Sequence, residues 1–256
     1  MLASQSADPG GCMPIRMSRV GSEGETARRA TLVEDSPLFA GISEDERRGI
    51  VSAAYEKHFA RRQTIFLDGD PVRQVVLLTS GSAKIVQFGQ NGSEVILRLK
   101  GPGEVVGTVG LFSQVRHCAT AQALRASTAL VWEASVFDSI AQRSALLRRN
   151  MTSILHQQLQ ELEERYCEIS TERVAVRLSH QLVRLLNQVG RRVNGAIEIR
   201  LSREELAQLT GTTLFTVSRL LSDWNQRGIL SARREAVAVH DFQALAQLAE
   251  VDEPAR

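Results

Sequence analysis

The hydrophobic pattern changes its period once along this chain, and that change divides the chain. Between about residues 58 and 133, short β-rich runs alternate with turn sequences at a spacing of roughly ten residues, which predicts an antiparallel sandwich or barrel. After residue 135 the apolar residues recur every three or four positions, as they do in helices. The 256 residues exceed one typical domain, so we expect an α+β protein with at least two units.

Turn and cap signals support this division. Asn91-Gly92 is a strong hairpin signal, because it supplies positive φ angles cheaply. Upstream of the strands, Ser43 stands three residues before Glu46, a capping-box pattern that predicts a short helix. Residues 1–35 are rich in Ser, Gly, Arg and Glu and poor in large apolar groups, so we expect a disordered tail there.

Composition restricts the partners and the compartment. Thirty-one basic and 29 acidic residues give a net charge of +2, so any DNA contact must come from a local surface. Cys12, Cys118 and Cys167 lack CxxC spacing, which argues against a disulfide framework, a cysteine zinc site and a four-cysteine iron–sulfur cluster within one chain. Reduced thiols, the lack of an apolar run of roughly 20 residues and the lack of a signal peptide predict a cytoplasmic protein with no membrane partner.

An apolar stripe with steps of four and three residues runs along a helix that is otherwise polar. Its members, here called the seam, are Leu155, Leu159, Leu162, Tyr166 and Ile169. Such a heptad pattern packs against a second surface. That surface is either the barrel of the same chain or the same helix of a second copy, and the length of the helix favours a parallel dimer.

Residues 198–240 have the plan of a winged helix-turn-helix. Ser202 and Glu205 form a second capping box, and Gly211 supplies the tight turn before a helix at 213–224. Residues 228–230 and 236–239 read as the two strands of a wing, joined through Arg233-Arg234-Glu235.

The helix at 213–224 has an apolar face and a face of short donors. Val217, Leu220, Leu221 and Trp224 are expected to face inward. The candidate DNA-binding residues are Thr212, Thr213, Phe215, Thr216, Ser218 and Arg219. Arginine pairs with guanine O6 and N7, and threonine meets a phosphate or a thymine methyl group. The alternative is an ordinary amphipathic helix with a solvated face.

Several segments, in order and spacing, resemble the Crp/Fnr superfamily of bacterial transcription regulators over roughly residues 36–243. They are Leu38-Phe39-Ala40-Gly41, Asp68-Gly69-Asp70-Pro71, Leu78-Thr79-Ser80-Gly81, Pro102-Gly103-Glu104-Val105-Val106-Gly107, Leu201-Ser202-Arg203-Glu204-Glu205-Leu206-Ala207 and Thr216-Val217-Ser218-Arg219-Leu220-Leu221.

The resemblance implies three consecutive parts and a function. The parts are a cyclic-nucleotide-binding-like β jelly-roll barrel at 36–135, a dimerisation helix at 136–170 and a winged helix-turn-helix at 171–243, followed by a C-terminal tail at 244–256. The implied function is a homodimeric transcription regulator that binds a palindromic operator, with an unidentified signal at the barrel and RNA polymerase as a further partner. No nucleophile elbow, phosphate loop or HExxH motif is present, and we do not expect an enzyme.

The sequence departs from the family at three places. The residues corresponding to the effector pocket are Gly107, Thr108, Val109, Ala119 and Thr120. Thr108 and Ala119 stand where cyclic-AMP-binding members have Glu and Arg, and without that guanidinium the cyclic phosphate has no obvious partner. Phe215 replaces a base-reading Glu, so the operator is expected to differ there. The cysteine cluster of the oxygen-labile iron–sulfur sensors is absent.

Two alternatives stay open within this interpretation. His117-Cys118 are residue types that ligate haem iron, as in a gas sensor of the same family, although an ordinary pair on the barrel surface explains them too. The chain could also be a ligand-sensing barrel that acts mainly through protein partners, but that hypothesis leaves the wing and the Thr/Ser/Arg face unexplained.

Overall fold

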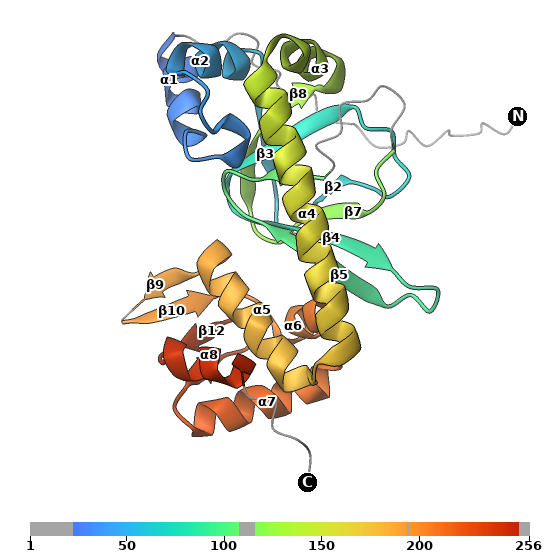
Figure 1. Ribbon diagram of the computed structural model, residues 1–256, viewed down its shortest axis with the longest axis vertical. Coiled ribbons are helices and arrows are strands. Elements are labelled where there is room, and N and C mark those ends of the chain that lie inside the picture. The colour runs from blue at the N-terminus through green and yellow to red at the C-terminus, as the bar shows by residue number, and fades with distance from the viewer. Residues whose placement is uncertain (1–22, 108–115, 194, 251–256) are drawn as a thin grey trace, which may run out of the picture.

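The computed structural model describes residues 23–107, 116–193 and 195–250 of the chain. A β-sandwich lies at one end and a smaller unit of helices and short strands, here called the C-terminal unit, lies at the other (Figure 1). The long helix α4 (Ala145–Thr171) runs from the sandwich to the C-terminal unit and joins them. This arrangement confirms the expected α+β class.

Two four-stranded antiparallel sheets form the sandwich. One sheet has the order β1-β8-β3-β6 and the other β2-β7-β4-β5. The strands are β1 (Tyr55–Phe59), β2 (Thr64–Phe66), β3 (Gln74–Ser80), β4 (Ala83–Phe88), β5 (Glu94–Lys100), β6 (Val105–Val106), β7 (Thr120–Ala123) and β8 (Ser127–Glu133). Apolar side chains of both sheets, among them Leu78, Ile85 and Val131, meet in one buried cluster. Gly92 has a φ of +77° in the β4–β5 turn, as the Asn-Gly signal predicts.

The expected disordered tail at 1–35 is wrong from residue 23 onward. Helix α1 (Glu23–Leu32) packs on α2 (Glu44–Ser52), and the 3-10 turn at Pro37–Phe39 lies between them. Ala30 and Val33 are buried in one cluster with Leu38 and Phe39. A few well-placed apolar residues therefore order a segment whose average composition is polar. Residues 1–22 lie outside the described residues. Ser43 caps α2 by accepting from the Glu46 N–H at 3.3 Å, as predicted.

The helix expected at 136–170 is broken in two. Helix α3 (Ala134–Arg143) buries Phe137 against Trp132 of the sandwich, with ring centroids 5.4 Å apart. Ser144 then ends α3 and caps α4, because its hydroxyl accepts from the Leu147 N–H and donates to Glu46. The first half of α4 is anchored on the sandwich side by Asn150, whose amide donates to the carbonyls of Leu38 and Ala40.

The C-terminal unit packs four helices and a small sheet around one apolar core. Its elements are α5 (Val174–Val189), β9 (Arg191–Val193), β10 (Ala196–Ile199), α6 (Arg203–Thr210), α7 (Leu214–Gln226), β11 (Leu230–Ala232), β12 (Val237–Val239) and α8 (Phe242–Glu250). The sheet has the order β11-β12-β10-β9. Leu182, Leu206, Leu221 and Trp224 belong to its core.

The expected C-terminal tail at 244–256 is wrong as far as residue 250. Leu245 on α8 is fully buried, and the Ser179 hydroxyl of α5 donates to its carbonyl at 2.5 Å. Helix α8 therefore completes the core of the C-terminal unit rather than trailing from it. Residues 251–256 lie outside the described residues. In the part of the chain that the structure describes, no helix combines the length and the apolar character that a bilayer crossing requires.

Candidate nucleic-acid interface

Helices α6 and α7 form the predicted helix-turn-helix, and local side chains fix each boundary. The Ser202 hydroxyl accepts from the Glu205 N–H at 3.1 Å, and the Glu205 carboxylate accepts from the Ser202 N–H at 2.7 Å. Gly211 follows α6 with a φ of +62°, a conformation that costs glycine little. Thr213 then caps α7 by accepting from the Thr216 N–H at 3.2 Å. The capping box and the glycine turn are confirmed.

The first two turns of α7 present the predicted face to solvent. Val217, Leu221 and Trp224 are buried on the opposite side. Phe215 is 85% exposed, and Arg219 is exposed with no hydrogen bond or ion pair to any residue that the structure describes. Arg219 is therefore a free guanidinium on an exposed helix face, a suitable donor for a base edge or a phosphate.

The candidate DNA-binding residues with short hydroxyl side chains differ in their exposure. Thr212, Thr216 and Ser218 are half-buried, whereas Thr213 is exposed. The hydroxyls of Thr213 and Thr216 lie 3.0 Å apart and bond to each other, so each already has a partner before any DNA arrives. Leu214 is 45% exposed at the start of α7, beside Phe215.

Strands β11 and β12 form the predicted wing. Their turn is closed by a bond from the Arg233 N–H to the Ala236 carbonyl at 2.7 Å, and Arg233 and Arg234 are exposed. The Glu235 carboxylate pairs with Arg61 of the sandwich at 3.1 Å, and this hydrogen bond holds the pKa of Glu235 below its usual value. Both partners are solvent-exposed, so the pair contributes little to stability.

The seam on α4 is exposed along its whole length. Its five residues Leu155, Leu159, Leu162, Tyr166 and Ile169 are 39–74% exposed. The neighbouring face of α4, which carries Gln158 and Arg165, lies instead against the sandwich and the C-terminal unit. Of the two surfaces that could cover the seam, the barrel of the same chain does not.

Arg165 is a functional candidate that the sequence did not reveal. Its guanidinium donates to the carbonyls of Leu97 and Ile96 on β5 and, at 2.7 Å, to that of Leu209 on α6. Burial lowers the pKa of this guanidinium, and the charge of Arg184 lowers it further. One side chain of the long helix thus connects the sandwich to the first helix of the helix-turn-helix. A single Arg among Glu and Gln residues gives no sequence signal of this.

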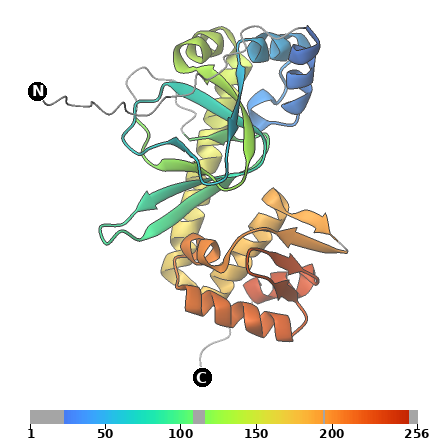
Figure 2. The same cartoon turned by 180° about the vertical axis from the view of Figure 1, so that it is seen from behind.

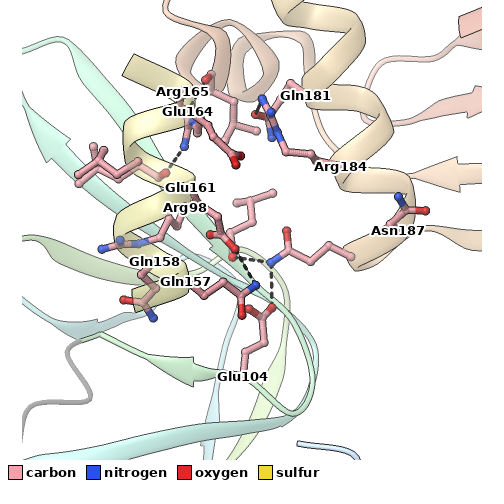
Figure 3. Close-up of a pocket in the computed structure, with 15 residues that line it drawn as sticks. Arg98, Glu104, Gln157, Gln158, Glu161, Glu164, Arg165, Gln181, Arg184 and Asn187 are labelled. Carbon is pink, nitrogen blue, oxygen red and sulfur yellow. Dashed lines mark hydrogen bonds between the residues drawn. The ribbon is translucent and has the colours of Figure 1, made fainter. Parts of the chain in front are cut away.

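A cavity of about 410 Å³ opens beside Arg165, between α4, α5 and β5 (Figure 3). On its α5 side the Gln188 amide donates to the Leu99 carbonyl and to Glu104, both at 2.9 Å. Nearby, Glu168, Glu172 and His180 lie close enough together to hold a cation. Arg184, however, binds both Glu168 oxygens at 2.6 and 2.7 Å, so that carboxylate already serves as an ion pair between α4 and α5.

The residues predicted for the effector pocket are only partly described. Gly107, Ala119 and Thr120 lie in the sandwich, where Ala119 and Thr120 are buried and the Thr120 hydroxyl accepts from the Asp68 N–H at 3.1 Å. Thr108 and Val109 lie outside the described residues. The guanidinium of nearby Arg116 is bound to the Gly69 carbonyl at 2.6 Å on the surface.

The ordinary surface pair proposed for His117-Cys118 is wrong for His117. Its ring is buried and stacks on Phe66, with centroids 3.6 Å apart, and burial lowers its pKa. The Nδ1 atom is buried and has no partner among the described residues. Cys118 is exposed, so the two side chains do not share one environment.

Models of two protein families match this chain, one over the sandwich and one over the C-terminal unit. Residues 56–144 match the model of the cyclic nucleotide-binding domain, and residues 176–248 match that of the Crp-like helix-turn-helix domain. Together the two matches span more than half of the chain.

Similar proteins include whole regulators of comparable length. The cyclic AMP receptor protein of Thermus thermophilus is 27% identical over 85% of this chain and 98% of its own length. The CRP-like cAMP-activated global transcriptional regulator of Mycobacterium tuberculosis is 23% identical over 83% of this chain and 96% of its own length. Among solved structures, FixK2 of Bradyrhizobium japonicum has the same fold, with a TM-score of 0.68 at 22% identity over 79% of this chain and 99% of that one.

The sandwich and the helix-turn-helix with its wing fall within the two matched segments, and α4 connects them. The relatives that match nearly the whole described chain are transcription regulators and not enzymes. The chain belongs to the Crp/Fnr superfamily of transcription regulators.

Proposed function

We propose that this regulator acts as a homodimer that inserts helix α7 of each copy into successive major grooves of a palindromic operator. The observation that carries the proposal is the free, exposed Arg219 on α7, in a chain whose seam is also exposed and unpaired. Two α7 helices related by a two-fold axis read half-sites centred roughly one helical turn apart, about 34–36 Å. The partner is duplex DNA, so the regulator acts in the cytoplasm, with RNA polymerase as a further partner at promoters.

Selection of bound fragments from a random duplex library tests the proposal. The expected product is a palindrome, and binding is expected to weaken steeply with salt because α7 and the wing neutralise phosphates. A protein that ignores every duplex at low ionic strength would instead support a barrel that acts through protein partners.

Arg219→Ala is expected to weaken operator binding by about 1–3 kcal/mol, roughly 5- to 150-fold, and to relax the preference at one base pair of each half-site. The reason is the loss of a bidentate donor whose guanidinium is not engaged by any residue in the described part of the chain. Electrophoretic mobility shifts against single-base variants of the operator measure it. Arg227→Ala is the matched control, because Arg227 lies beyond the end of α7 and is paired with Asp223 at 3.6 Å. Unchanged discrimination in Arg219→Ala would remove this residue from the interface.

Phe215→Glu is expected to change which operator is bound rather than only how tightly. A phenyl ring touches a thymine methyl group, whereas a carboxylate accepts from cytosine N4. Repeating the library selection with the variant should move one position of each half-site toward cytosine, at about 1–3 kcal/mol of discrimination. Phe215→Leu keeps an apolar contact and serves as the control. The same selected motif for all three proteins would contradict a base contact at this position.

The signal at the barrel acts on the equilibrium between two arrangements of the C-terminal unit, a population shift. The proposed effector pocket is formed by Gly107, Thr108, Val109, Ala119 and Thr120. Its ligand is not cyclic AMP, because the buried Ala119 offers no guanidinium to a cyclic phosphate and Arg116 is held on Gly69. Calorimetric titration with cyclic AMP is expected to show no binding, and saturable binding would overturn this assignment.

A further inference from the structure

A second cavity, of about 230 Å³, lies where the sandwich meets the C-terminal unit. Its sandwich wall contains Ser82 and Arg125, and its other wall contains Arg191, Glu198 and Arg200. We propose that this junction cavity binds a small anionic ligand that carries a phosphate group. It is separate from the effector pocket of the barrel and from the DNA-reading face of α7.

The charges that line the cavity do not balance. Three guanidiniums face one carboxylate, and Glu198 is already paired with Arg200 at 2.7 Å. Arg125 and Arg191 have no carboxylate within ion-pair distance among the described residues. The C-terminal end of α5, which also reaches the cavity, contributes about half a negative charge. The net charge therefore remains positive, which favours a ligand with one or two negative charges.

Arg125 is held in place for such a ligand. Its guanidinium donates to the Arg200 carbonyl at 2.8 Å, which leaves further N–H groups for an acceptor. Burial lowers the pKa of Arg125, and the charges of Arg200, Arg61 and Arg191 lower it further. Like charges that gather around a half-buried guanidinium raise the free energy of the empty site, and an anion between them relieves the repulsion.

The remaining donors suit a phosphate group. Ser82 is buried at the cavity wall, where its hydroxyl adds a neutral donor beside the guanidiniums. A phosphate has three acceptor oxygens, and arginine binds them bidentately. The volume is smaller than that of a drug-sized pocket, about 300–1,000 Å³, so it fits a phosphate with a small organic group.

The position of the cavity argues for a small ligand and against duplex DNA. Helix α7 lies at the end of the C-terminal unit that is remote from the sandwich, as both views show (Figures 1 and 2). A duplex seated on α7 therefore leaves the junction cavity uncovered. A ligand that bridges Arg125 of the sandwich and Arg191 of the C-terminal unit would stabilise their present arrangement, and it could shift operator affinity by that route.

Phosphate binding to the full-length protein tests the proposal directly, without DNA. Inorganic phosphate is titrated by calorimetry and by thermal melting, with sodium chloride at matched ionic strength as the reference. Saturable binding is expected, and Arg125→Gln and Arg191→Gln should each weaken it about tenfold. Arg192→Gln is the matched control, since neighbouring residues of a strand point to opposite faces and Arg192 does not line the cavity.

Each outcome decides the proposal. Saturable binding that both variants weaken and the control retains would support it. Equal effects of phosphate and chloride in calorimetry and thermal melting would overturn it. Equal phosphate affinity of the parent and the three variants would overturn it too. Competition between a DNA duplex and phosphate, together with a weaker salt dependence of DNA binding in Arg191→Gln, would indicate that the cavity contacts the DNA backbone. That result would overturn the proposal of a small ligand. If Arg125→Gln fails to fold, Arg191→Gln still decides, because the exposed side chain of Arg191 makes no hydrogen bond or ion pair with the described residues.

Discussion

Replacing Leu159 and Leu162 together by glutamate is expected to abolish high-affinity operator binding while leaving each chain folded. Both side chains are more than half exposed in the single chain, so charges there cost the monomer little. In a dimer each of these residues lies opposite the same residue of the second copy. Glutamates there would repel one another, and moving their charges out of water costs a large free energy. A monomer binds only one half-site, so it loses the affinity that a dimer gains by binding both half-sites together, about 10²- to 10⁴-fold.

Analytical ultracentrifugation and mobility shifts of the same preparation measure this effect. The matched control is Ser153→Glu with Gln160→Glu, which adds the same charge on the exposed face of α4 opposite the seam. The control should remain a dimer and bind as the parent does. A seam variant that still sediments as a dimer would show that another surface joins the two copies.

Arg165→Met is expected to cause the largest loss of stability among single substitutions at the junction. The methionine fills much of the same space but leaves the carbonyls of Ile96, Leu97 and Leu209 without their charged donor. Hydrogen bonds to a charged group contribute about 1.5–3 kcal/mol each and are not additive, so we expect a loss of about 2–4 kcal/mol. This corresponds to a fall in Tm of roughly 5–15 °C.

Differential scanning calorimetry measures this change, and Arg149→Met is the control because Arg149 is exposed on the same helix. Arg165→Lys should recover only part of the stability, since one ammonium cannot reproduce the planar guanidinium that reaches both β5 and α6. Equal melting of Arg165→Met and Arg149→Met would show that the bridge contributes nothing to the junction.

The helix-turn-helix could be predicted from the sequence because its signals are local. Ser202 and Thr213 each cap a helix through an N–H three residues further along, and Gly211 meets the φ requirement of the turn between them. Such contacts depend on neighbours in the chain, so the residue types and their spacing are sufficient.

The two terminal helices show where local patterns fail. The segment that contains α1 has a polar composition, yet Ala30 and Val33 are buried by residues of α2 and of the 3-10 turn at Pro37–Phe39. Leu245 on α8 is buried against α5, which lies far upstream in the chain. Burial by a distant partner leaves no periodic signal strong enough to separate a short helix from a tail.

The sequence by itself determined the order of the parts, the caps of the helices, the seam and the face of α7, because each follows from spacing within a few residues. Only the tertiary structure decided that the barrel leaves the seam open, that Arg165 joins β5 to α6, and that Arg125 meets Arg191 and Arg200 at one cavity. These residues come from separate elements, and a hydrophobic period specifies which face of an element is buried but not which distant element covers it.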